Sequence, residues 1–181
     1  MRRALWLAAI LVALAPTLAT AGGRIGVGVF GGASFPIVQD DVGTGSTYGA
    51  RVPLEVLPLI TIEPYFAGSA MGEGEATLDG ETYTRDGFDM TAFGGNVMLG
   101  SPSSPGFQLL PYVGIGYNHL TRAGSADIDE VGFNFGLGVG FAVLQKLSLQ
   151  ARGELNMVVT GDTSRKFGNL TVGVNYNLLK F

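Results

Sequence analysis

Residues alternate strictly between apolar and small side chains from Val131 to Val143, and this two-residue period limits what the chain can fold into. Valine, phenylalanine and leucine occupy the odd positions, whereas glycine, asparagine and alanine occupy the even ones. Successive side chains of a β-strand point to opposite faces, so the pattern indicates a strand with one apolar face and one face of small residues. The chain beyond about residue 22 shows no helical period, so the sequence predicts an all-β fold.

Seven further segments show the same alternation with more noise, and clusters of Gly, Pro, Ser and Asp separate them. Each is about ten residues or longer, which is enough for a tilted strand to cross a bilayer. In one segment the phase slips at Gly94-Gly95; we interpret the slip as a β-bulge that follows an outward-facing Phe88, Met90 and Ala92. The eight expected strands are Arg24–Phe35, Thr47–Val56, Leu59–Met71, Gly87–Leu99, Phe107–Thr121, Val131–Val143, Leu147–Val158 and Phe167–Phe181.

The connections between these strands alternate in length. The short ones are Leu57-Pro58, the turn from Ser101 to Gly106, and Gln145-Lys146. An even strand count with short periplasmic turns and longer extracellular loops is typical of outer-membrane barrels, so both termini are expected on the periplasmic side. The four longer connections, expected outside the cell, run approximately over Pro36–Ser46, Gly72–Asp86, Arg122–Asp129 and Val159–Arg165.

The first residues of the chain have the features of an export signal. A basic start, Met1-Arg2-Arg3, precedes an apolar run from Ala4 to Leu18, and Ala19-Thr20-Ala21 fits the small-residue rule for cleavage. An uncleaved anchor is the alternative, but the run is short for a spanning helix, which needs about 20 residues. We therefore expect residues 1–21 to be a cleaved signal peptide and residues 22–181 to form one barrel domain.

Two kinds of barrel fit eight alternating strands. A soluble, lipocalin-like barrel places its apolar face inside and a charged face in water, whereas a transmembrane barrel inverts this arrangement. The centres of the expected strands carry no Asp, Glu, Lys or Arg on the apolar face, and the 29 glycines suit a narrow interior. The sequence thus predicts an eight-stranded antiparallel up-and-down transmembrane β-barrel. The aromatic residues expected at the membrane interfaces are Tyr48, Phe88, Phe107, Tyr117 and Tyr176.

Charged residues within the expected strands fall on the inward face. Counted from the turn at Leu57-Pro58, Arg51 and Glu63 reach nearly the same height on neighbouring strands. Buried charges must be paired to be tolerated, so we expect a mid-barrel layer of ion pairs that plugs the lumen. The residues assigned to this layer are Arg51, Glu55, Glu63, Arg152 and Glu154.

Other chemistry finds little support in the residues. The acidic loops are interpreted as solvated surface rather than a calcium site, and neither a metal nor a cofactor is expected. No basic run supports nucleic-acid binding. Asn118-His119-Leu120-Thr121 is distantly similar to the His-Xaa-Ser of lipid A deacylases, with Thr121 in place of serine. An interfacial imidazole is the interpretation we favour for His119, so the paired carboxylates and this histidine do not predict an enzyme.

The eight-strand plan, the segment Pro111-Tyr112-Val113-Gly114-Ile115-Gly116-Tyr117 and the terminal Phe181 together resemble a known family. The chain is similar to the small outer-membrane β-barrel domain proteins, the OmpA-like and OmpX-like barrels often grouped as a porin family. Counting back from Phe181, Asn177 and Asn175 fall where that family prefers apolar residues. This departure implies either a weaker assembly signal or a bulge near Asn177.

This resemblance implies a location and a set of partners. The location is the Gram-negative outer membrane, where lipid and lipopolysaccharide surround a monomeric barrel, and the barrel-assembly machinery reads the C-terminal strand through Phe181. The implied role is structural, adhesive or surface-interacting. A narrow channel or transporter for small or hydrophobic solutes is the first alternative, and a lipid A-modifying enzyme is the second.

Overall fold

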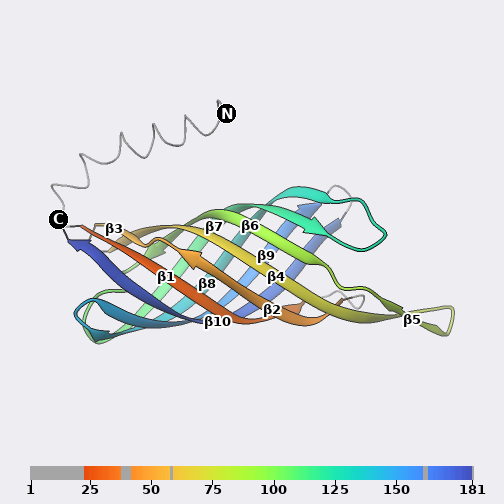
Figure 1. Cartoon of the computed structure of the whole chain (residues 1–181), viewed down its shortest axis with the longest axis horizontal. Coiled ribbons are helices and arrows are strands. Elements are labelled where there is room, and N and C mark those ends of the chain that lie inside the picture. Colours follow the sequence, from red (N-terminus) through yellow and green to blue (C-terminus); the bar gives the residue numbers. More distant parts are fainter. Residues whose placement is uncertain (1–22, 38–41, 58, 161–162, 181) are drawn as a thin grey trace, which may run out of the picture.

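The computed structural model describes residues 23–37, 42–57, 59–160 and 163–180. Antiparallel strands follow one another around a closed ring of eight, in which β2 and β3 share one place and β5 branches from β4 (Figure 1). The predicted signal peptide and Phe181 lie outside the described residues. The strands are β1 Arg24–Pro36, β2 Val42–Arg51, β3 Leu54–Leu57, β4 Ile60–Leu78, β5 Glu81–Arg85, β6 Asp89–Leu99, β7 Phe107–Thr121, β8 Ile128–Leu144, β9 Leu147–Thr160 and β10 Thr163–Lys180.

The ring closes through its first and last strands. β1 pairs with β10 along its whole length, from Arg24 opposite Lys180 to Pro36 opposite Phe167. Closure pairs the backbone groups that would otherwise form free sheet edges. The predicted all-β, eight-stranded, up-and-down architecture is confirmed. Within the described residues, no helix is long and apolar enough to cross a membrane.

The two ends of the barrel differ in their connections. One end carries the start of β1, the end of β10 and the turns after Leu57, Leu99 and Leu144; we call it the turn end. The other, the loop end, carries the longer connections and the projecting β4–β5 hairpin (Figure 1).

The segment Gly72–Asp86, predicted to be a loop, is largely a β-hairpin. β4 continues to Leu78 and pairs with β5, from Gly74 opposite Arg85 to Leu78 opposite Glu81. Asp79 and Gly80 both have positive φ, 53° and 86°. Two such residues match the twist of a two-residue hairpin, and Asp-Gly is a favoured pair there. The hairpin therefore extends the sheet beyond the ring.

The bulge predicted at Gly94-Gly95 is absent, and the direction assigned to Phe88, Met90 and Ala92 is wrong. β6 keeps one register with β4 and with β7 along its length. Phe88 and Met90 are buried with other apolar residues inside the ring, so even-numbered residues face inward throughout β6. Gly94 is also inward, where an added Cβ would lie 2.9 Å from the Tyr65 hydroxyl.

A register irregularity does occur near Asn177. Ile25 lies opposite Leu179, but the next residue, Gly26, lies opposite Asn177, so Leu178 is the extra residue. The bulge interpretation of Asn177 is thus confirmed. A second irregularity at the same end leaves Val143 unpaired between Ala142 and Leu144. Both bulges lie where the strands reach the turn end.

The outer face of the ring is apolar, whereas the inner face carries polar residues and glycines together with two apolar clusters. Exposed outward residues include Val29, Phe66, Phe135 and Val172. Asparagines, serines and the charged residues Arg51, Glu55, Glu63 and Arg152 are buried inside the ring. A water-soluble barrel would show the reverse distribution, so the predicted inversion of the two faces is present in the structure.

Candidate functional site: the polar layer of the lumen

The lumen is filled in three layers. Near the loop end, the inward apolar residues Met71, Phe88, Leu120 and Phe167 are buried against one another. Near the turn end, Met98, Leu110 and Tyr112 form a second apolar cluster. Polar side chains lie between the two. Along β6 the inward residues run from Met90 through Asn96 to Met98, and Phe88 directly precedes the strand, which shows the order of the layers.

Glu63 is the centre of the polar layer. Arg152 Nη1 donates to Glu63 Oε1 at 2.6 Å, and Arg152 Nη2 donates to Glu63 Oε2 at 2.6 Å. Asn96 Nδ2 donates to Glu63 Oε1 at 3.2 Å. Such a bidentate pair is short, charge-assisted and directional. Glu63 is 0 % exposed, so the pair is shielded from water.

Arg51 completes this part of the layer from β2, the strand next to Glu63. Its Nε donates to Asn175 Oδ1 at 2.9 Å and lies 4.0 Å from Glu63 Oε2. Its guanidinium lies over the Phe30 ring, 5.4 Å from the centroid. An added Cβ at Gly173 would lie 2.6 Å from Arg51 Nη2. Glycine on the inner face of β10 therefore makes room for the arginine.

Glu154 is held by neutral donors rather than by a cation. Tyr112 Oη donates to Glu154 Oε2 at 3.0 Å, and Asn134 Nδ2 donates to the same oxygen at 3.1 Å. Asn156 and Asn169 donate to Oε1 at 2.9 and 3.2 Å. Asn134 also donates to Asn96 Oδ1 at 2.9 Å, so the Glu154 and Glu63 groups are one network.

Glu55, which was assigned to the same layer, lies elsewhere. Its Oε2 is 3.7 Å from Arg24 Nη1, and its Oε1 accepts from the Ser103 backbone N–H at 3.2 Å. Pro102 of the same turn is fully buried. Glu55 therefore holds the β6–β7 turn at the turn end, and the inclusion of Glu55 in the mid-barrel layer is corrected. The charges lie at two heights because Glu55 is only two residues from the end of its strand.

The four charges of the polar layer balance, and little space is left among them. Arg51 and Arg152 oppose Glu63 and Glu154. The cavity that they line has a volume of about 40 Å³. One buried water molecule needs a cavity volume of roughly 10–15 Å³, so the layer has room for only a few water molecules. As placed, the side chains pack a closed layer around a small void.

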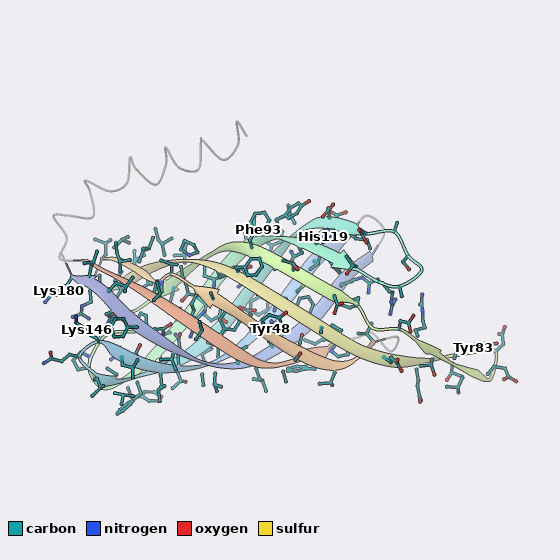
Figure 2. All side chains as sticks on the ribbon, in the orientation of Figure 1. Tyr48, Tyr83, Phe93, His119, Lys146 and Lys180 are labelled. Carbon is teal, nitrogen blue, oxygen red and sulfur yellow. The ribbon has the colours of Figure 1, made fainter. Side chains whose placement is uncertain are left out.

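Four of the five predicted interfacial aromatic residues face outward. Tyr48, Phe107, Tyr117 and Tyr176 are exposed on the outer face. Phe88 is 5 % exposed inside the ring, so its assignment is wrong. Phe93 is an outward-facing aromatic residue whose direction the assumed bulge concealed, and its ring lies 5.3 Å from that of Tyr117 (Figure 2). An unbroken alternation through Gly94-Gly95 would have identified Phe93 and excluded Phe88.

His119 lies on the outer surface near the loop end (Figure 2). Its Nδ1 is 2.7 Å from Asp129 Oδ1 on the neighbouring strand. The register also places Thr91 opposite His119 from the other side. Among the described residues, no group of three or more His, Cys, Asp or Glu side chains could hold a metal ion.

The comparisons with known proteins agree with this architecture. A family model for the outer membrane protein β-barrel domain matches residues 5–177. The chain does not match any curated protein sequence significantly. Among solved structures, Neisserial surface protein A is similar with a TM-score of 0.63 and 13 % identity, over 87 % of this chain and 98 % of that one.

Two further solved structures are similar at the level of the fold. A major outer membrane protein from Thermus thermophilus has a TM-score of 0.62 and 13 % identity, over 86 % of this chain and 99 % of that one. The Yersinia pestis outer membrane protein Ail in a phospholipid bilayer nanodisc has a TM-score of 0.53 and 15 % identity, again over 86 % and 99 %. At these identities the similarity shows the fold alone.

Proposed function

The chain belongs to the outer membrane protein β-barrel domain family, and from this premise we propose a closed, non-catalytic barrel with a structural, adhesive or surface-interacting role. The single observation that carries the proposal is the polar layer around Glu63, held between two apolar layers. A solute would have to displace a buried, bidentate ion pair and the apolar clusters on either side. The interactions of such a barrel therefore take place at its surfaces.

The two ends of the barrel support a proposed orientation in the membrane. Short turns and termini are typically periplasmic in this architecture, whereas longer loops are extracellular. We assign the turn end to the periplasm and the loop end, with the β4–β5 hairpin, to the outside. Neisserial surface protein A shares the fold, and its name is consistent with a barrel that presents its loops at the cell surface. The hairpin and loops would carry any adhesive contact.

The proposed partners come from the same setting. The apolar outer face would be surrounded by outer-membrane lipid, with lipopolysaccharide beside the loop end. The C-terminal strand and the following Phe181 would be the segment that the barrel-assembly machinery recognises. Because the ring has no free edge between β1 and β10, a monomer is the expected state.

Planar bilayer recording tests the closed lumen. The wild-type barrel should give no stable conductance. Arg51→Ala removes one side of the polar layer and should raise brief leak events. Arg24→Ala is the matched control, because Arg24 lies at the turn end outside that layer. A large, steady wild-type conductance would support the alternative of a narrow channel or transporter and would overturn the closed lumen.

The second alternative, a lipid A-modifying enzyme, is favoured by one contact. The 2.7 Å pair of His119 and Asp129 is exposed on the lipid-facing side, where a histidine oriented by a carboxylate could act as a base. A hydroxyl nucleophile in contact with His119 would be needed as well, and the bonds of the described residues include none. Mass spectrometry of lipid A from cells with the wild type or His119→Ala decides this alternative. Identical lipid A profiles would remove it.

A further inference from the structure

A cleft opens at the turn end between three segments that are distant in sequence. Its volume is about 730 Å³, and its walls come from the β6–β7 turn, the β8–β9 turn and the end of β10. The two register irregularities described above, at Val143 and Leu178, lie in these walls. The Asn177 N–H donates to the Lys146 carbonyl at 2.8 Å, which fixes the β8–β9 turn against β10.

Cations gather around this cleft. Arg24, Lys146 and Lys180 line it, and Figure 2 shows both lysines at the turn end. Glu55 interacts with Arg24, but neither lysine forms an ion pair within the described part of the chain. The projecting hairpin contrasts with this end, because residues 73–86 contain five carboxylates and one arginine. The positive charge of the cleft thus lies at the opposite end of the molecule from the acidic hairpin.

Apolar side chains lie beside these cations. Leu144, Leu178 and Leu179 are large, exposed and part of the cleft wall. The bulge at Leu178 leaves two consecutive leucines, Leu178 and Leu179, exposed at the end of β10. A ligand that satisfies the whole cleft therefore needs an anionic group for the lysines and a hydrocarbon chain for the leucines.

We propose that the turn-end cleft binds an anionic phospholipid, with its phosphate between Lys146, Lys180 and Arg24 and an acyl chain along Leu178 and Leu179. Free phosphate would meet the cations but leave the leucines in water. A zwitterionic lipid would meet the leucines but add a positive charge beside the lysines. Placing this lipid in the inner leaflet rests on the proposed orientation, whereas the binding itself does not.

Native mass spectrometry of the purified protein in a zwitterionic detergent tests the site. The probes are dioctanoyl phosphatidylglycerol, dioctanoyl phosphatidylcholine and inorganic phosphate. Each lysine near a lipid surface contributes about five-fold in affinity, so Lys146→Gln with Lys180→Gln should weaken phosphatidylglycerol binding about 25-fold. Phosphatidylcholine should bind weakly to all variants, and inorganic phosphate should bind more weakly than phosphatidylglycerol.

Lys166→Gln is the matched control. Lys166 is an exposed lysine on β10, the strand that also carries Lys180, but it lies at the loop end. It should leave phosphatidylglycerol binding unchanged, and heat-modifiable gel mobility should show every variant folded. Equal binding of phosphatidylglycerol to Lys166→Gln and to the double variant would overturn the site. Equal binding of inorganic phosphate and phosphatidylglycerol to the wild type would overturn the role of the leucines. Neither outcome depends on whether the lumen conducts.

Discussion

Phe135 and Glu154 lie close together on neighbouring strands but meet opposite surroundings. Phe135 faces outward beside Leu155 and is 50 % exposed, whereas Gly136 and Glu154, one step along each strand, face the lumen. Outside, an apolar side chain needs no partner because hydrocarbon is its solvent. Inside, Glu154 accepts hydrogen bonds from four donors. The alternation therefore separates a lipid-facing surface, with few constraints on packing, from an interior in which charged side chains depend on specific hydrogen-bond partners.

The largest expected effect comes from removing the central carboxylate. Glu63→Ala leaves Arg152 and Arg51 buried without their shared anion, which should lower the free energy of unfolding by about 3–5 kcal/mol. Urea titration in lipid vesicles, followed by circular dichroism, measures the loss. Glu81→Ala, on the exposed hairpin, is the control and should change little. A Glu63→Ala barrel as stable as the wild type would contradict the claim that the charged side chains in the lumen need their partners.

A charge placed on the outer face should cost slightly less. Phe135→Arg puts a cation into hydrocarbon and should lower stability by about 2–4 kcal/mol. Tyr83→Arg on the hairpin is a sharp control, because Tyr83 is 55 % exposed and Phe135 is 50 % exposed. Equal costs for both substitutions, in the same vesicle titration, would mean that Phe135 does not face lipid.

Adding a single methyl group, by a Gly→Ala substitution, should change stability differently on the inner and outer faces. An added Cβ at Gly136 would lie 2.5 Å from the Tyr112 hydroxyl and 2.6 Å from the Gly153 carbonyl, whereas one at Gly95 would have nothing within 4 Å. Gly136→Ala should therefore lower the free energy of unfolding by about 1–3 kcal/mol. Gly95→Ala should be nearly neutral. Reversal of this order would show that the lumen is not packed as described.

The smallest effect is expected at the tip of the hairpin. Gly80 has a φ of 86°, so Gly80→Ala strains the turn by about 1–2 kcal/mol. Because the hairpin projects beyond the ring, the strain should increase amide hydrogen exchange in residues 74–85 and leave the barrel midpoint in urea unchanged. A shift of the barrel midpoint would show that the hairpin and ring unfold together.

The sequence allowed the ring and part of its lumen to be predicted. Alternation gave the faces of seven strands, and height above a turn brought Arg51 and Glu63 together. The same reasoning failed for Phe88, because the lumen is apolar near the loop end and an apolar residue can face either way there. Counting residues from the turn also placed Glu55 and Glu63 at too similar a height in the barrel, because heights on different strands depend on strand tilt and bulges.

Other features carried a weaker signal. Three of the four donors around Glu154 are asparagines on three strands, and their contacts depend on registers that no single segment specifies. The hairpin at Asp79-Gly80 was predictable from its turn residues, but the surrounding acidic residues favoured a loop. Cleavage after Ala21 and the role of Phe181 stay predictions.

Single-cysteine scanning from 131 to 143 tests the central claim most directly, because the chain contains no cysteine. Each variant is labelled with a fluorophore, refolded into vesicles, and quenched either by brominated lipid chains or by a water-soluble quencher. The account predicts a two-residue oscillation in which lipid quenching is strongest at odd positions, from Val131 to Val143. Lipid quenching that is strongest at the even positions, or that shows no oscillation, would contradict it.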